Sequence, residues 1–369
     1  MAEPLLGSLT SNSTCLKLLF VSTPVGPLGS GMGGGVELTL QNMAQILRQR
    51  GHIVEVIAPQ GSQLKDTPVL EIDGVLQVPA QTQERTAPIV MPGCSVLARL
   101  WDYARQVQAQ YDLIINFAYD WLPFYLTPFF TRPIAHLISM GSLTDAMDHV
   151  IAQVAVQAPG TLGVHTQTQA ATFPFADQCR YLGSGLELSL YHFCGEPGQD
   201  LCWMGRLAPE KGLEDAVAAV QATGTSLKIL GHIGDQAYWQ RIQAEYPEAP
   251  IEYLGFLPTT QMQQVLRCCR ALLVTSRWVE AFGNVLIEAL ACGVPVIAYE
   301  RGGPAEIVQD GKTGWLVKPD SVPELIAAIK RIDQIDRAVC RRQAELEYSL
   351  QAFGDRLEKW FAEILTARR

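Results

Sequence analysis

Two carboxylates stand at a spacing suited to binding a ligand around the start of a helix. Glu280 and Glu288 flank a Phe-Gly-Asn triplet at residues 282–284, after which the sequence predicts an apolar helix. The first N–H groups of a helix have no partner within it and form a natural anion seat. Glu288 is a lone carboxylate in this helix and needs hydrogen bonds, which ligand hydroxyls can supply. The arrangement fits a sugar nucleotide, unless Glu288 pairs with a buried arginine and Glu280 is a surface acid.

A second group of charges follows a predicted strand, at residues 205–212. Arg206 offers a planar fork for phosphate oxygens, and Lys211 adds a point charge beside the start of the next predicted helix. In an acidic chain these cations form a local positive site that suits a diphosphate. The alternative is a solvated loop, or a surface ion pair between Arg206 and Glu210.

A glycine-rich loop at residues 26–35 follows the first predicted strand. Residues 29–34 match Gly-x-Gly-x-x-Gly, which by itself suggests a dinucleotide-binding fold and a nicotinamide-dependent oxidoreductase. Two details weaken this interpretation. The loop begins several residues after the strand, and the acid expected at the end of the second strand is missing, since Glu55 sits mid-strand. The loop better suits the approach of a phosphate or sugar, unless it binds nothing.

These residues need rigid elements to position them, and the sequence predicts alternating strands and helices. In the first half, short apolar runs predict strands at 17–23, 53–58, 112–116, 133–138, 161–165 and 179–182, with a helix at 36–50. In the second half, strands are predicted at 201–204, 226–230, 251–253, 271–275, 294–298 and 315–317, and helices at 213–222, 238–246, 260–268, 284–291, 304–308 and within 322–369. Such alternation predicts two doubly wound α/β domains with parallel sheets, whose ligands bind beyond the carboxyl ends of the strands.

Composition shifts suggest the domain boundaries. We expect a loose N-terminal tail (1–16), an acceptor-side Rossmann-like domain (17–190), a linker rich in Gly, Pro and charge (191–200), a nucleotide-sugar domain (201–347), and a C-terminal helix (348–369) that packs back on the first domain. Two such domains that face a deep cleft suit an enzyme that joins two substrates.

Composition and charge exclude several classes of protein. The chain has 369 residues, 48% hydrophobic and 18% charged, with a net charge of −9, which argues against binding nucleic acid or holding firmly to an anionic membrane. The nine cysteines form no C-x-x-C pair, and buried free thiols in a reducing cytoplasm are the expectation. The first 16 residues lack the pattern of a secretory signal, and no apolar run is long enough to span a membrane.

The C-terminal half resembles a known enzyme family. The block from Glu280 to Ile297, followed by Gly302-Gly303 and Gly311–Val317, resembles the retaining glycosyltransferases of family 4, which have the GT-B fold. The resemblance implies that Arg206 and Lys211 hold the donor diphosphate, that Glu288 binds the ribose hydroxyls, and that Glu280 meets the transferred sugar. It further assigns donor contacts to Phe282, Gly283 and Asn284, base contacts to Gly255 and Phe256, and a phosphate-side loop to Gly33, Gly34 and Gly35.

The N-terminal half narrows the resemblance. Residues 21–31, 116–123 and 136–142 resemble the cyanobacterial glucosyltransferases that move glucose from UDP-glucose to tetrahydrobiopterin. A pterin acceptor is therefore implied, and the seven aromatic residues between Phe117 and Phe130 can flank such a ring, although aromatic residues are more often core. His136 ends a strand and is expected to face the cleft as a catalytic residue beside the sugar, with His165 a weaker candidate; either can instead be structural.

The expected reaction retains the anomeric configuration by same-face substitution. Arg206, Lys211 and the helix start would stabilise the departing diphosphate, and a leaving-group oxygen would take the acceptor proton. No metal or other cofactor is expected, and the chain contains no Asp-x-Asp motif. Rival interpretations are a lipid-linked or phosphosugar acceptor, a nicotinamide-dependent oxidoreductase, and a sugar-nucleotide sensor without activity.

Overall fold

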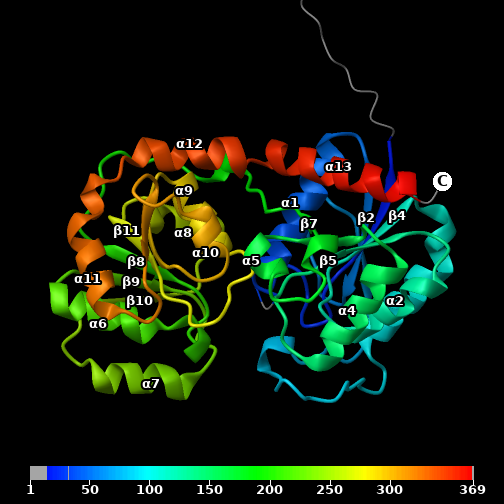
Figure 1. Ribbon diagram of the computed structural model, residues 1–369, viewed down its shortest axis with the longest axis horizontal. Helices are drawn as coiled ribbons and strands as arrows, with labels where there is room; N and C mark the ends of the chain where they lie inside the picture. Colours follow the sequence, from blue (N-terminus) through cyan, green and yellow to red (C-terminus); the bar gives the residue numbers. More distant parts are fainter. Residues whose placement is uncertain (1–14, 32, 368–369) are drawn as a thin grey trace, which may run out of the picture.

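The computed structural model describes residues 15–31 and 33–367, so nearly all of the expected tail lies outside the described residues. The chain forms two lobes, each built on one parallel sheet with helices on both faces (Figure 1). The prediction of two doubly wound α/β domains is confirmed.

The first lobe contains a seven-stranded sheet in the order β3-β2-β1-β4-β5-β6-β7. Its strands are β1 (Lys17–Val21), β2 (Ile53–Pro59), β3 (Val69–Ile72), β4 (Leu113–Asn116), β5 (Ile134–Leu137), β6 (Leu162–Val164) and β7 (Arg180–Tyr181), and its helices are α1 (Gly35–Gln49), α2 (Val96–Val107), α3 (Trp121–Leu126), α4 (Asp145–Gln157) and α5 (Gln167–Ala170). The strand order reverses between β1 and β4, which opens a crevice at their carboxyl ends.

The second lobe contains a six-stranded sheet in the order β10-β9-β8-β11-β12-β13. Its strands are β8 (Leu201–Met204), β9 (Leu227–Leu230), β10 (Ile251–Gly255), β11 (Ala271–Val274), β12 (Val296–Tyr299) and β13 (Gly314–Val317), and its helices are α6 (Leu213–Thr223), α7 (Gln236–Glu245), α8 (Thr259–Leu266), α9 (Asn284–Ala291), α10 (Gly303–Ile307), α11 (Val322–Arg331) and α12 (Arg337–Glu347). Here the switch lies between β8 and β11, so the segments after these two strands share one edge.

Short 3₁₀ helices link several of these elements. They are η1 (Ala80–Thr82), η2 (Gln108–Gln110), η3 (Thr127–Phe129), η4 (Ala176–Gln178), η5 (Leu188–Leu190), η6 (Pro209–Lys211) and η7 (Ile332–Gln334). Among them, η6 follows β8 at the switch point and carries Lys211.

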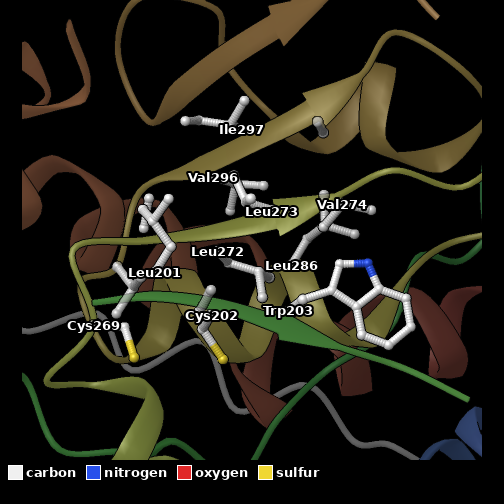
Figure 2. Close-up of a cluster of buried hydrophobic side chains, with 14 of the residues drawn as sticks. Leu201, Cys202, Trp203, Cys269, Leu272, Leu273, Val274, Leu286, Val296 and Ile297 are labelled. Atoms are coloured by element: carbon white, nitrogen blue, oxygen red, sulfur yellow. The ribbon is translucent and has the colours of Figure 1, made fainter. Parts of the chain in front are cut away.

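The core of the second lobe explains why its strands are continuous apolar runs in the sequence. Strands of a parallel sheet are covered on both faces, so neighbouring residues are buried whichever way they point. Figure 2 shows Leu201, Cys202 and Trp203 of β8 beside residues of β11 and β12. The Trp203 indole donates a hydrogen bond of 3.1 Å to the Thr275 hydroxyl, which fixes the end of β11 at the switch point.

The last helix, α13 (Leu350–Ala367), leaves the second lobe and lies along the first, where it packs on α1 (Figure 1). Its Glu358 accepts hydrogen bonds from Arg50 at 2.5 Å and from His52 at 3.0 Å. The Arg356 guanidinium donates to the carbonyl of Leu182 at 2.6 Å, in the segment where the chain leaves the first sheet. The helix therefore ties the two lobes together.

The lobes also meet directly where α5 faces α10 (Figure 1). The Glu306 carboxylate accepts hydrogen bonds from the backbone N–H groups of Gln167 and Thr168. The Thr166 hydroxyl donates to the Ala281 carbonyl at 2.8 Å, next to Glu280. This junction sets the first lobe against the edge that carries the predicted site.

The nine cysteines are all free thiols, five of them buried. Within residues 15–31 and 33–367, no helix has the length and apolar character needed to cross a membrane.

Candidate active site

Glu280 lies in the loop between β11 and α9 and is held by three donors. Its Oε2 accepts hydrogen bonds from Lys211 Nζ at 2.5 Å, Trp278 Nε1 at 3.0 Å and Ser276 Oγ at 3.2 Å. Burial raises the pKa of Glu280, but the Lys211 charge and these hydrogen bonds outweigh it, so the pKa lies below its ordinary value. Glu280 is therefore an ionised acceptor with a fixed position, and not a surface acid.

The turn after β8 brings Lys211 to Glu280. Gly212 has a φ of +63°, and a Cβ there would lie 2.2 Å from the Thr275 carbonyl oxygen. Only glycine allows this approach of the loop to the end of β11. The Lys211 ammonium also lies 4.8 Å from the Trp278 ring centroid, where a cation is stabilised.

Arg206 takes the arrangement that the sequence left as an alternative. Its guanidinium pairs with Glu210, four residues further on, and 35% of the side chain is exposed. Its side-chain stem packs closely on Gly234, where a Cβ would lie 2.6 Å from it. Arg206 thus lies in the same turn as Lys211, with one acidic partner that an anion would have to replace.

The start of α9 meets the start of α1. Gly283, with a φ of +96°, caps α9, and the Asn284 side chain donates to the Gly35 carbonyl of α1 at 3.1 Å. The Phe282 ring points into the core, 5.6 Å from the His165 ring, so it contributes only backbone to this edge. Two helix N-termini from different lobes therefore converge near Glu280, and both favour an anion.

The glycine-rich loop is organised by Glu37, a residue that the sequence analysis did not select. The Glu37 carboxylate accepts hydrogen bonds from the backbone N–H groups of Gly29 at 2.9 Å, Gly31 at 3.2 Å and Gly33 at 2.6 Å. These backbone N–H groups are already paired, which argues against a binding site for a dinucleotide pyrophosphate in the loop. Gly34 and Gly35, at the start of α1, remain the part of the loop that faces α9.

Glu288 is buried, and its observed partner is a tyrosine. The Tyr191 hydroxyl donates to Glu288 Oε1 at 3.0 Å. Burial raises the pKa of Glu288 to about 7, and the Tyr191 hydrogen bond offsets part of that rise. The carboxylate therefore changes charge near neutral pH, and no buried arginine pairs with it among the described residues.

The predicted base contacts lie at the edge of the second lobe. Gly255 ends β10 with a φ of +72°, and the half-exposed Phe256 ring stacks on His232 at a centroid distance of 4.3 Å. Gly31 of the first lobe lies against this stack, since a Cβ there would be 3.4 Å from the Phe256 ring. An exposed aromatic pair at this edge can stack on a nucleotide base.

The prediction that His136 faces the cleft is wrong. His136 lies within β5 and is 0% exposed. Its ring nitrogens contact the Asn116 side chain at 3.1 Å and the Thr127 hydroxyl at 2.9 Å, and its ring stacks on Phe124. Burial lowers the pKa of His136 to about 3, so the ring stays neutral and acts as a structural link between β4, β5 and η3. The sequence pattern failed because the strand continues past His136, which turns its side chain inward.

His165, the weaker candidate, lies at the junction of the lobes. Its Nδ1 contacts the Gly183 carbonyl at 2.8 Å, and its backbone N–H donates to the Gln169 side chain at 2.7 Å. Burial lowers the pKa of His165, which also keeps this ring neutral. It supports the position of Phe282 and does not reach the charged edge.

Some residues of this edge carried a signal in the sequence and others did not. Glu37 is an acid in the first turn of the helix that follows a glycine loop, a position where acids are favoured. Trp278 stands two residues before Glu280, so it could have been selected as a neighbour of that motif. Tyr191 gave no signal, because it comes from the linker and its contact with Glu288 spans 97 positions.

Within residues 15–31 and 33–367, no group of three or more His, Cys, Asp or Glu side chains is arranged to hold a metal ion.

A protein-family comparison matches most of the second lobe. Residues 196–346 match the family described as Glycosyl transferases group 1. Glycogen synthase from Mycobacterium tuberculosis is 34% identical over 152 residues, which is 39% of this chain and 36% of that protein. The matched region thus spans about a third of the length of this relative, and it agrees with the resemblance carried by the Glu280–Ile297 block.

Solved structures match both lobes. Anabaena HepE in complex with UDP and glucose has a TM-score of 0.75 and 20% identity over 95% of this chain and 100% of that chain. Sucrose-phosphate synthase from Thermosynechococcus elongatus has a TM-score of 0.74 and 18% identity over the same shares. At these identities the likeness shows the fold, and the predicted GT-B architecture is confirmed.

Proposed function

We propose that this chain is a retaining glycosyltransferase that moves glucose from UDP-glucose to a small acceptor, a reduced pterin such as tetrahydrobiopterin. The observation that carries the proposal is Glu280, an ionised carboxylate fixed by Lys211 beside the start of α9. A fixed hydroxyl acceptor next to a cation and a helix N-terminus suits a sugar attached to a diphosphate.

The donor would lie along the edge where the two lobes meet. Its diphosphate would occupy the space between Lys211, Arg206 and the backbone of Gly283-Asn284, with Gly34-Gly35 of α1 opposite. The ribose hydroxyls would donate to Glu288, and the base would lie at Gly255-Phe256. Support for a uridine donor comes from HepE, whose structures contain UDP and glucose, UDP alone, or UDP-glucose.

In the reaction, the bond between the glucose anomeric carbon and the diphosphate oxygen breaks as the acceptor oxygen approaches from the same face. Negative charge develops on the leaving diphosphate, and Lys211, Arg206 and the α9 N-terminus stabilise it. The acceptor hydroxyl gives its proton to an oxygen of the leaving phosphate. Glu280 orients the glucose through its hydroxyls, and we propose that no metal is needed because the protein supplies the positive charge.

Product analysis by mass spectrometry tests the proposal. The purified chain would be incubated with UDP-glucose, GDP-mannose or ADP-glucose, each with tetrahydrobiopterin and with a phosphosugar. We expect a glucosylated pterin from UDP-glucose alone. Nuclear magnetic resonance should show that the product keeps the α-anomeric configuration of the donor. A product of inverted configuration, or transfer that persists unchanged in Glu280→Ala, would contradict the proposal.

A further inference from the structure

A cavity of about 150 Å³ opens in the first lobe beside the glycine-rich loop. Gly33 and Thr23 lie on its side nearest the start of α1, so it adjoins the proposed donor edge. Its roof is the loop at residues 76–92, and its far wall is formed by the starts of α3 and α4. The position is suited to the second substrate of a transfer reaction.

The lining of this cavity carries one charged side chain, Asp120, and contains no Lys, Arg or His among the described residues. Its other polar groups are neutral amides and hydroxyls, including those of Gln77, Ser139 and Thr144. A phosphorylated acceptor would find no cation here and would face a carboxylate. The lining therefore disfavours anionic acceptors.

Asp120 is held in place but keeps capacity to accept further hydrogen bonds. Its Oδ2 accepts one from Gln77 Nε2 at 3.3 Å, and the same amide donates to the Val90 carbonyl at 3.4 Å. Burial raises the pKa of Asp120, and the backbone N–H groups of Leu122 and Trp121 partly offset that rise. A carboxylate has about four acceptor positions, so a ligand with N–H or O–H donors can still bind it.

Aromatic side chains make the cavity suitable for a flat ring. Phe117, Tyr119 and Trp121 all line it. The Tyr119 hydroxyl donates to the Gly141 carbonyl at 3.0 Å, and the Trp121 ring stacks on Tyr125 at a centroid distance of 4.4 Å. Fixed aromatic walls favour a planar ligand, because they offer apolar area at little entropic cost.

The nearby cation Arg85 already pairs with carboxylates of α4. Its guanidinium donates to Asp145 at 2.7 Å, Asp148 at 2.5 Å and Ser142 at 2.5 Å. These bonds anchor the roof loop to the start of α4, and they leave Arg85 paired with two carboxylates. It therefore shapes the cavity and does not provide a phosphate site.

We propose that Asp120 recognises the acceptor, and that the acceptor is a small non-anionic molecule with a flat ring edge bearing adjacent N–H donors. A carboxylate can accept two parallel hydrogen bonds from such an edge, and a 2-amino-pyrimidinone ring presents one. This inference rests on the proposed function, which already names a pterin acceptor, and it adds the residue that recognises the acceptor.

The test measures acceptor binding directly, separately from donor chemistry. Tetrahydrobiopterin binding would be followed by anaerobic calorimetry for wild type and Asp120→Asn, with and without UDP. We expect the variant to bind the pterin about 10- to 100-fold more weakly, because it loses charge-assisted hydrogen bonds to the ring. The affinity for UDP should stay unchanged in both proteins.

Two controls separate recognition from folding. Asp235→Asn changes the corresponding residue before α7 in the other lobe, where Asp235 caps the helix, and should leave pterin affinity unchanged. A pterin methylated at its ring N–H should bind wild type poorly and lose less affinity in Asp120→Asn, which a merely structural role would not produce.

Equal pterin affinity in wild type and Asp120→Asn would overturn the inference. So would turnover of fructose 6-phosphate by wild type with the efficiency seen for the pterin. Failure of UDP to bind wild type would instead count against the proposed function, and pterin binding would still test Asp120.

Discussion

The two lobes present opposite kinds of surface to the substrates. The second lobe offers a charged edge where Lys211 and Glu280 pair at 2.5 Å, beside the start of α9. The first lobe offers a cavity with aromatic walls and, among the residues that the structure describes, one carboxylate, Asp120. The first arrangement suits a charged, hydroxyl-rich donor, and the second suits a neutral ring.

The difference also lies in how each surface is encoded. Glu280, the start of α9 and Glu288 all come from one continuous block, so their relative positions follow from local structure. The cavity instead brings together loop 76–92, the segment after β4 and the segment after β5. A site built locally can be recognised from a motif, whereas a site assembled from distant loops is visible only in the folded chain.

The largest expected effect is at the charged edge. Lys211→Ala should reduce kcat/KM for UDP-glucose by about 10²- to 10³-fold, because a charge aimed at the leaving diphosphate is lost. Rates of UDP release measure this. Lys228→Ala is the matched control, since Lys228 forms a peripheral ion pair with Asp200, and its rate should equal wild type. Equal losses in both variants would show that Lys211 has no special role at the charged edge.

A second prediction concerns the interior of the first lobe. His136→Ala should lower the free energy of unfolding by about 2–4 kcal/mol, because it removes a packed ring and two buried hydrogen bonds. Urea unfolding measures the loss, and the affinity of the folded protein for UDP should not change. His149→Ala, at an exposed position on α4, should leave stability nearly unchanged. Full stability of His136→Ala with loss of turnover would restore a catalytic role.

A third prediction sharpens the role of Glu288, whose pKa is raised to about 7. In the proposed donor complex, the ribose hydroxyls donate to the ionised carboxylate, so bound donor lowers the pKa of Glu288. Affinity for UDP should therefore be complete above pH 7 and fall as the pH drops through about 7, by up to about tenfold per pH unit.

Calorimetry between pH 5.5 and 8.5 would measure this dependence, with Glu288→Gln as the control that isolates it from titration of the UDP phosphate. Tyr191→Phe removes a hydrogen bond that lowers the Glu288 pKa and should move the midpoint to higher pH. A pH profile identical in wild type and Glu288→Gln would rule out the ribose contact.

The smallest expected effect is that of metal removal. In the proposed reaction, Lys211, Arg206 and two helix starts supply the positive charge, so turnover should be unchanged in excess EDTA. Rates of UDP release before and after chelation measure this. Loss of activity in EDTA, restored by Mg²⁺ or Mn²⁺, would show that the charged edge is incomplete without a cation.

Most of the sheet framework was predictable from short apolar runs. Strand β8 and helix α9 have the predicted bounds, and most other strands differ by one or two residues. The missed strand, β3 (Val69–Ile72), is a partly exposed edge strand, so it lacks the continuous apolar run of the central strands. Sequence periodicity therefore reports burial, and it missed this exposed edge strand, although the edge strands β7 and β10, which are also exposed in part, were predicted.

The site was predictable only where local geometry decides it. The block around Glu280 placed an acceptor at a helix start, because loop and helix are contiguous. The hydrogen-bond partners of the site residues could not be predicted, because they depend on which side chains folding brings together. Examples are Tyr191 at Glu288, Glu37 at the glycine-rich loop, and the buried hydrogen bonds of His136.

By itself, the sequence determined two doubly wound lobes and a carboxylate pair around a helix N-terminus, since hydrophobic patterning and contiguous motifs act over a few residues. Tertiary structure alone decided that Glu280 is ionised by Lys211, that Glu288 titrates near neutral pH, and that His136 is buried. It also decided that Asp120 is the one charged side chain among the described residues that line an aromatic cavity. Charge state and access depend on burial and on partners distant in sequence, which only the folded chain brings together.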